Sequence, residues 1–290
     1  MSIRSYTVLC GNTPLIKIND SLYAKLETYS PSGSVKDRVV SYVVNKAIQD
    51  KAISSNTTLC EATSGNTGIA LSAAAAALGL ECVVFMPSNM SEERKQMMRI
   101  YGATIVESPP DDFEAAIKMR DEFLGRHVHA WSPMQFSNPA NVECHEAVTA
   151  PEIHKNITDI GLTWSAFVHG AGTGGTIEGL RRYIIGRQMS TKVIMTQPSE
   201  SPHGIQGIAD GKEFLALDSD MSGIIKVDSA AAIERAKQFA KETGLLVGIS
   251  SGANLLAAQR WIDENNPSGV VITMLCDRGE RYMSIYGDDN

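Results

Sequence analysis

Apolar residues fall into short β-branched or aliphatic runs that alternate along the chain with longer segments of helical periodicity. The short runs predict strands at residues 22–26, 57–60, 81–86, 103–106, 128–131, 166–169, 193–196, 224–227 and 270–275. The longer segments predict helices at residues 34–48, 92–101, 112–123, 177–185, 230–243 and 253–264, and the alanine-rich run 69–78 predicts a buried helix. This alternation is typical of βαβ units, so we expect an α/β protein whose mostly parallel sheets are covered by helices on both faces.

A turn signal near the middle of the chain, Ser137-Asn138-Pro139-Ala140, suggests a hinge between two α/β lobes of unequal size. Open parallel sheets bind ligands in the loops that follow the carboxyl ends of their strands. The loops that lead from a predicted strand into a predicted helix are therefore the places to look for chemistry.

The composition and net charge disfavour some classes of binding partner. The chain has 290 residues, 43% of them hydrophobic and 20% charged, and a net charge of −7, which argues against nucleic acid or an anionic membrane as a partner. The first residues contain no apolar signal core, and five dispersed cysteines are typical of reduced thiols, so we expect a cytoplasmic protein. The histidines and cysteines lack metal-ligand spacing, and we expect no metal site.

A glycine-rich loop, Gly170-Ala171-Gly172-Thr173-Gly174-Gly175-Thr176, joins a predicted strand to a predicted helix. Glycines allow the backbone to approach a ligand, and a helix start offers N–H groups and a positive dipole end, so this loop suits a phosphate. The loop also satisfies the GxGxxG dinucleotide pattern, but no acidic residue ends the next strand, which runs into Gln197-Pro198. A single phosphate therefore fits better than NAD.

Three further segments carry candidate chemistry. Residues 61–68 (Glu-Ala-Thr-Ser-Gly-Asn-Thr-Gly) bring hydroxyls and glycines to a helix start and suit a carboxylate, although an N-cap at Ser64 or Asn66 is the plain alternative. Lys36 lies in the first turn of a helix, where the dipole and Arg38 would lower its pKa and help to make a neutral amine nucleophile. Residues 248–254 open another helix with paired serines, which suit either an N-cap or a ligand contact.

Taken together, these segments resemble the fold type II pyridoxal-phosphate enzymes, and within them the cysteine synthases (O-acetylserine sulfhydrylases) of the B-type branch. The resemblance runs over nearly the whole chain in collinear order. It rests on Gly11-Asn12-Thr13-Pro14-Leu15, Lys25-Leu26-Glu27, Ser34-Val35-Lys36-Asp37-Arg38, residues 61–68, Met86-Pro87, Gln135-Phe136-Ser137-Asn138-Pro139, residues 172–176, residues 201–204, residues 248–252 and residues 276–282.

The resemblance implies a tryptophan synthase β-like fold, in which two unequal open-sheet lobes hold pyridoxal 5'-phosphate in the cleft between them. It implies a larger lobe of residues 1–33 and 139–290 that anchors the cofactor, and a smaller mobile lobe of residues 34–138 that binds the substrate carboxylate. It also implies that Lys36 is the catalytic residue and the covalent anchor of the cofactor. The other implied cofactor contacts are Asn66, Gly172, Thr173, Gly174, Gly175, Thr176 and Ser250, and the implied substrate contacts are Thr63, Ser64, Thr67 and Gln135.

The implied activity is synthesis of L-cysteine from O-acetyl-L-serine and sulfide or thiosulfate, through an α-aminoacrylate intermediate. A homodimer and a complex with serine acetyltransferase are the implied assemblies.

The sequence departs from many cysteine synthases at Gly207-Ile208-Ala209-Asp210-Gly211-Lys212, which stands where they have Gly-Ile-Gly-Ala-Gly-Phe. This departure leaves the leaving group and the sulfur donor open. Cystathionine β-synthase activity, a hydrogen sulfide-releasing β-lyase activity and use of O-phosphoserine remain alternatives, whereas retention of Lys36 argues against a role in partner binding alone.

Overall fold

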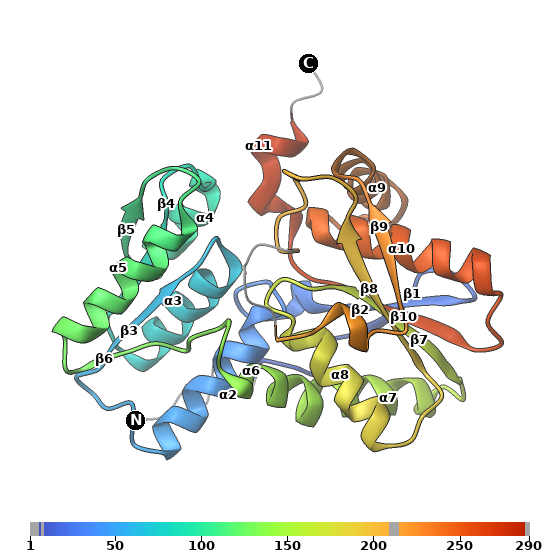
Figure 1. Cartoon of the computed structure of the whole chain (residues 1–290), viewed down its shortest axis with the longest axis horizontal. Coiled ribbons are helices and arrows are strands. Elements are labelled where there is room, and N and C mark those ends of the chain that lie inside the picture. The colour runs from blue at the N-terminus through green and yellow to red at the C-terminus, as the bar shows by residue number, and fades with distance from the viewer. Residues whose placement is uncertain (1–5, 7–8, 209–214, 288–290) are drawn as a thin grey trace. The chain divides into compact units, whose positions relative to one another are not determined.

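The computed structural model describes residues 6, 9–208 and 215–287 and has the α/β architecture expected from the sequence (Figure 1). The chain forms two compact units. The smaller unit consists of Met1–Cys10 and Ser30–Asn138, and the larger unit of Gly11–Tyr29 and Pro139–Asn290. The mobility and the ligand roles expected of the two lobes remain predictions.

The sheet of the smaller unit has, among the described residues, four strands in the order β5-β4-β3-β6, and every pairing is parallel. The strands are β3 (Thr58–Ala62), β4 (Cys82–Pro87), β5 (Thr104–Ser108) and β6 (Ala130–Trp131). Its helices are α2 (Lys36–Gln49), α3 (Asn66–Leu78), α4 (Glu92–Ile100) and α5 (Phe113–Arg126).

Alternate residues of the central strands enter different hydrophobic clusters, as the two-residue period of a strand requires. Leu59 and Val84 belong to a cluster with residues of α2 and α3, whereas Cys60 and Phe85 belong to one with residues of α5. Helix α3 is buried along most of its length, as its alanine-rich sequence predicts. Both faces of this sheet are therefore covered.

The larger unit contains, in its described part, a six-stranded sheet in the order β1-β2-β10-β7-β8-β9. The strands are β1 (Leu15–Lys17), β2 (Leu22–Leu26), β7 (Trp164–Gly170), β8 (Lys192–Pro198), β9 (Gly223–Val227) and β10 (Val270–Leu275). Only the edge strand β1 runs antiparallel among these described strands, because a short turn joins it to β2. Strand β10 is buried along its whole length, as expected of a central parallel strand.

Helices lie on both faces of this sheet (Figure 1). One face carries α9 (Ser229–Thr243) and α10 (Ile249–Asn265), and the other carries α6 (Pro139–Cys144), α7 (Ala150–Asp159) and α8 (Gly175–Gly186). A π-helical segment, His145–Thr149, joins α6 to α7. The shorter elements are the 3₁₀ turns Glu27–Tyr29, Asp218–Asp220 and Gly279–Tyr282, and α11 (Met283–Tyr286).

Most predicted strands and helices are present, with ends that differ from the expected ones by at most four residues. The strand predicted at residues 128–131 begins two residues later, because residues 128–129 form a turn in which the Ala130 N–H donates to the His127 carbonyl over 2.9 Å, and Ala130–Trp131 then pair with β3. Helix α10 begins at Ile249, and its N-cap is Gly248, so the paired serines lie inside the helix. Strand β1 and the helical run from Pro139 to Asp159 were not predicted.

No helix in the ranges that the structure describes combines the length and the apolar composition needed to cross a bilayer. Four of the five cysteines are buried, and the thiols form no disulfide. Burial raises the pKa of Cys60 and of Cys82 to about 12, so both thiols stay protonated near neutral pH.

Candidate active site

Lys36 is the first residue of α2 and thus lies in the first turn of a helix, as the sequence predicts; it is half-buried. The loop before it turns at Gly33, whose φ of +84° is favourable only for glycine. The Lys36 N–H donates to the Ser34 hydroxyl oxygen over 3.3 Å. The lysine therefore projects from a helix start whose preceding loop has a fixed shape.

Asp37 determines that shape from within the smaller unit. Its carboxylate accepts hydrogen bonds from the N–H groups of Ser32 (3.1 Å) and Ser34 (3.1 Å), and from the Tyr6 hydroxyl (2.6 Å). Burial raises the pKa of Asp37, and these hydrogen bonds oppose the rise. Because Asp37 follows Lys36 directly, the same contacts position the lysine backbone.

The predicted carboxylate loop follows β3 and enters α3, with Thr63, Gly65 and Thr67 buried. The Thr63 hydroxyl oxygen accepts from the Gly65 N–H over 3.1 Å. Gly65, and not Ser64 or Asn66, occupies the N-cap position of α3, so the plain N-cap interpretation of this segment is wrong. Gly65 has no side chain that could cap the start of α3, and no capping hydrogen bond is formed from it.

Gln135 reaches this loop from a distant part of the sequence. The Thr67 hydroxyl donates to Gln135 Oε1 over 2.6 Å, and Gln135 Nε2 donates to the Ala62 carbonyl over 3.1 Å. The structure thus joins two residues that the sequence analysis assigned to one substrate-binding site.

The glycine-rich loop of the larger unit follows β7 and ends at the start of α8. A Cβ on Gly172 would lie 2.5 Å from the Gly207 carbonyl oxygen, and one on Gly174 would lie 2.6 Å from the Ala216 nitrogen. Gly174 also has a φ of +84°. The loop is therefore closely enclosed by main chain, and side chains at these positions would disturb it.

Two residues beneath this loop were not predicted. Asn141 Nδ2 donates to the Thr173 hydroxyl oxygen over 3.0 Å, and a Cβ on Gly175 would lie 2.1 Å from Asn141 Oδ1. The buried His145 Nε2 lies 3.2 Å from the Thr176 hydroxyl, and its Nδ1 lies 3.0 Å from Thr149 Oγ1. The π-helical segment thus brings an imidazole ring to the first turn of α8.

Ser250 is buried in the first turn of α10, and a Cβ on Gly207 would lie 3.8 Å from its hydroxyl oxygen. One turn further, Asn254 Oδ1 accepts from the Gly170 N–H over 2.9 Å. Helix α10 and the end of β7 are thereby held together, which places Ser250 in the same unit and region as the glycine-rich loop.

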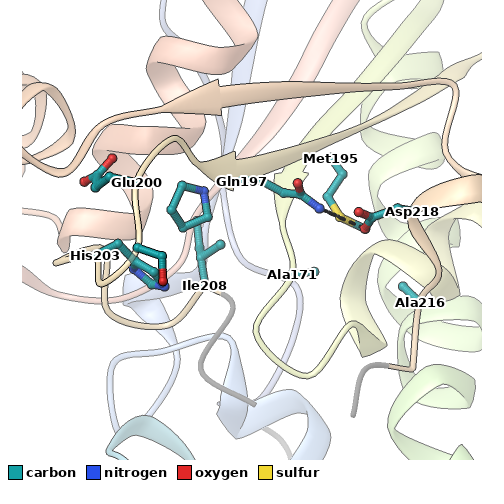
Figure 2. A pocket seen from close by; sticks show the side chains of 10 residues that line it. Ala171, Met195, Gln197, Glu200, His203, Ile208, Ala216 and Asp218 are labelled. Carbon is teal, nitrogen blue, oxygen red and sulfur yellow. Dashed lines mark hydrogen bonds between the residues drawn. The ribbon is translucent and has the colours of Figure 1, made fainter. Parts of the chain in front are cut away.

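A pocket of about 330 Å³ opens beside Ala171, at the carboxyl ends of β7 and β8. Figure 2 shows Gln197 and Asp218 on one side of it and Glu200 and His203 on the other. Gln197 Nε2 donates to Asp218 Oδ1 over 2.8 Å. Ser201 and His203, which belong to a segment that carries part of the resemblance, thus line a pocket beside Ala171 of the glycine-rich loop.

Comparison with known proteins identifies the family. Residues 6–277 match the family described as "Pyridoxal-phosphate dependent enzyme". The chain belongs to this family. It is 36% identical to the cysteine synthase of Staphylococcus aureus over 300 aligned positions, which cover 97% of this chain and 96% of that protein.

Two solved structures of this pyridoxal-phosphate family are similar to the whole chain. The hydrogen sulfide-producing enzyme of Fusobacterium nucleatum is 35% identical, with a TM-score of 0.90, and the match covers 98% of this chain and 90% of that one. The O-acetylserine-dependent cystathionine β-synthase of Helicobacter pylori is 32% identical, with a TM-score of 0.87, and the match covers 98% of each chain. The protein is therefore a fold type II pyridoxal-phosphate enzyme of the cysteine synthase type, and the predicted family, fold class and cofactor are confirmed.

The site residues fit pyridoxal 5'-phosphate. The loop before α8 ends in a helix start whose N-cap is Gly174 and which no side chain caps, and it carries the buried threonines Thr173 and Thr176, so its donor set suits a phosphate. The individual roles assigned to these residues, and to Lys36 and Asn66, remain predictions. Within the departing segment, Gly207 and Ile208 belong to the described structure, and residues 209–212 lie outside the described residues.

Proposed function

We propose that the protein makes L-cysteine from O-acetyl-L-serine and sulfide by a β-replacement reaction that depends on pyridoxal 5'-phosphate. The observations that carry the proposal come from each unit by itself: the smaller unit has a half-buried Lys36 at the start of α2 and a glycine-containing start of α3, and the larger unit has a glycine-containing start of α8. The substrate and the cofactor each carry an anionic group, and each helix start offers N–H donors and a positive dipole end to one of them.

In this proposal the start of α8 binds the cofactor phosphate, through Gly172, Thr173, Gly174, Gly175 and Thr176. Ser250 faces the pyridine nitrogen. A hydroxyl at that position leaves the nitrogen without an acidic partner, in contrast to a carboxylate. The support for both assignments is the close enclosure of the loop and its proximity to Ser250 through Gly207.

The start of α3 binds the substrate carboxylate in the proposal, through the loop of Thr63, Ser64 and Thr67 with Gln135 behind it, while Asn66 contacts the cofactor ring hydroxyl. Lys36 would anchor the cofactor covalently through Nζ, and the amino group of the substrate would displace it. The freed Nζ would then accept the α-proton of the bound amino acid. Bound pyridoxal phosphate supplies the electron withdrawal that makes this proton acidic. The hydrogen bonds of Asp37 keep the Lys36 backbone in place during the transfer.

Replacement of the lysine tests the proposal directly. Purified protein should be yellow, and Lys36→Ala should lose the visible absorbance of the covalently held cofactor and essentially all cysteine synthesis. The remaining catalysis should be lower by at least about a thousandfold, because a general base typically contributes 10²–10⁴-fold on its own. A colourless wild-type protein that rejects pyridoxal phosphate would contradict the proposed function.

The two related structures are of enzymes that carry out other reactions, so the substrates of this chain need an experiment of their own. A matrix of O-acetylserine, O-phosphoserine and L-cysteine as amino-acid substrates, each with sulfide, thiosulfate, homocysteine or no acceptor, separates the alternatives. Cysteine formed fastest from O-acetylserine and sulfide supports the proposal. Faster hydrogen sulfide release from cysteine, or faster cystathionine formation from homocysteine, would contradict the proposal and assign the chain the activity of the corresponding relative.

We further propose that the protein works in the cytoplasm as a homodimer and that serine acetyltransferase is a partner. The carboxylate loop is the proposed docking point, because a C-terminal carboxylate offers the same anionic group as the substrate. Size-exclusion chromatography with light scattering tests the dimer. Competition between a C-terminal acetyltransferase peptide and O-acetylserine tests the complex.

A further inference from the structure

The carboxylate loop is supported from below by a buried ion pair. Glu61, in β3, has no exposed surface, and Arg120, in α5, is 5% exposed. Glu61 Oε1 accepts from Arg120 Nη1 over 2.9 Å and from the Ala62 N–H over 2.8 Å. Its other oxygen, Oε2, accepts from the Gln135 N–H over 3.0 Å. The Glu61 carboxylate thus links α5, β3 and the segment that contains Gln135.

The partners of Glu61 balance the cost of burying its charge. Burial raises the pKa of Glu61, whereas Arg120 and the N–H groups of Gln135 and Ala62 oppose the rise. With Arg120 beside it, the pair adds no net charge beneath a loop that is proposed to bind an anion. An unpaired carboxylate there would repel the substrate.

The side chain of Gln135 has a fixed orientation. Its amide contacts the Ala62 carbonyl oxygen on one side and the Thr67 hydroxyl on the other. A carbonyl oxygen only accepts hydrogen bonds, so the amide nitrogen must face Ala62 and the amide oxygen must face Thr67. The Thr67 hydroxyl therefore donates its single hydrogen to Gln135.

This orientation limits what Thr67 can offer to a ligand. Its hydroxyl hydrogen is used inside the protein, so toward a carboxylate Thr67 offers its main-chain N–H and no hydroxyl donor. The geometry of the loop then depends on how accurately Gln135 holds Thr67. That accuracy depends in turn on Glu61, because Glu61 holds the Gln135 backbone.

We propose that Glu61 is a positioning residue that sets the carboxylate-binding geometry of the α3 start by acting through Gln135 and Thr67. The inference rests on the proposed function, because it assumes that the substrate is an α-amino acid whose carboxylate binds this loop. Glu61 is buried and does not touch the substrate. Its effect is on alignment, and small errors in alignment weaken both binding and catalysis.

Glu61→Gln is the sharpest variant because it keeps the shape and removes one acceptor. The new amide oxygen can face Arg120 and Ala62, but its NH₂ group then meets the Gln135 N–H, donor against donor. The Gln135 backbone must move, and Thr67 with it. Asp121→Asn is the matched control, because the half-exposed Asp121 is the second partner of Arg120, and the hydrogen bonds given for it involve none of Glu61, Gln135 and Thr67.

The readout separates the carboxylate from the rest of the ligand. The holoenzyme is titrated with L-alanine, which has an α-carboxylate and no β-leaving group, and with ethylamine, which lacks the carboxylate, while the visible absorbance of the cofactor is followed. Glu61→Gln should raise the Kd of L-alanine by at least about tenfold and leave that of ethylamine unchanged. Asp121→Asn should change neither Kd, and cofactor content should be equal in all three proteins.

Equal weakening of both ligands by Glu61→Gln, or no weakening of L-alanine, would overturn the inference. If the wild type itself binds L-alanine no better than ethylamine, the proposed function fails, and the inference fails with it. If Glu61→Gln does not fold, Thr67→Val takes its place, with Thr67→Ser as the variant that keeps the hydroxyl. Thr67→Val should weaken L-alanine alone, and unchanged binding would overturn the inference.

Discussion

Gly174 shows how a single residue constrains the phosphate loop. Its φ of +84° lies in the left-handed region, and a Cβ there would lie 2.6 Å from the Ala216 nitrogen. Main-chain atoms cannot move aside as a flexible side chain can, so a substitution would displace either the loop or the segment at Ala216. Gly186, at the other end of α8, has open space around it.

Gly174→Ala is therefore expected to weaken cofactor binding with little loss of fold. Left-handed strain costs about 1–3 kcal/mol, and relief of that strain would distort the phosphate cradle. We expect the Kd of the apoprotein for pyridoxal phosphate to rise by at least about tenfold. Gly186→Ala is the control, with unchanged cofactor affinity and equal or slightly higher thermal stability. Equal cofactor affinity in the two variants would contradict the role given to Gly174.

At the scale of single residues, the sequence predicts the site residues that belong to a short local motif. Lys36 and the glycine loops stand out because each lies within a few residues of a predicted strand end or helix start. The residues that support them in the folded protein have no such local signal. Arg120 lies 59 residues from Glu61, and His145 lies 31 residues from Thr176, so only the folded chain brings them together. No local pattern marks such pairs, so the sequence alone does not predict them.

At the scale of secondary-structure elements, Glu200 connects the start of α9 to the loop after β8. Glu200 lines the pocket beside Ala171 in the larger unit. Its carboxylate accepts from the Ser229 N–H (2.7 Å), the Ser229 hydroxyl and the Ser199 hydroxyl (2.7 Å). These hydrogen bonds, those from Ser229 above all, lower the pKa of Glu200 to about 2. The helix start thus stabilises the ionised form of a residue in the loop after β8.

The lowered pKa predicts a pH dependence with a definite sign. A carboxyl group with a pKa near 4.5 in the unfolded chain and about 2 in the folded one stabilises the fold above pH 4.5. This contribution is lost as the pH falls from 4.5 toward 2. The difference in melting temperature between the wild type and Glu200→Gln should therefore be constant above about pH 5 and shrink below it.

Ser229→Ala provides the control for this experiment. Removal of the hydroxyl donor should bring the folded pKa of Glu200 closer to its ordinary value, so Glu200→Gln should have a smaller effect in that background. A difference in melting temperature that grows on acidification would contradict the assignment.

The helical run from Pro139 to Asp159 shows why one element escaped prediction. Prolines at 139 and 151 suggest breaks, yet both lie in helix. Pro139 opens α6, where its missing N–H costs nothing, and Pro151 follows the π-helical segment, where the regular hydrogen-bond ladder is already interrupted. The π-helical segment makes this helical run difficult to predict from the sequence, and the same segment brings His145 to the first turn of α8.

For the whole molecule, alternation of strands and helices predicts the α/β class but not the strand order. In the larger unit β2 lies between β1 and β10, so residues 22–26 pair with residues 271–275. Periodicity along the chain carries no information about such distant neighbours. The fold class follows from local pattern, whereas the strand order needed the structure or the family resemblance.

The net charge of −7 bears on how the whole molecule binds an anionic cofactor. The sequence has no Lys or Arg between residues 156 and 180, a stretch that includes the entire glycine-rich loop. Binding there must depend on N–H groups and hydroxyls at contact distance, and not on long-range attraction. Salt screens charges that are separated by more than roughly 8 Å at physiological ionic strength, and it screens short contacts with enclosed neutral donors much less.

Phosphate binding should therefore be nearly insensitive to salt. Pyridoxamine 5'-phosphate, which has no aldehyde to react with a lysine, isolates this contribution when it is titrated into apoprotein of the Lys36→Ala variant. We expect its Kd to change less than about threefold between about 50 and about 500 mM salt, because neutral donors release few counterions. Pyridoxamine without the phosphate should bind far more weakly at both concentrations. A change of tenfold or more would show that cations elsewhere in the chain hold the phosphate, which would contradict a cradle made of glycine backbone and threonine hydroxyls.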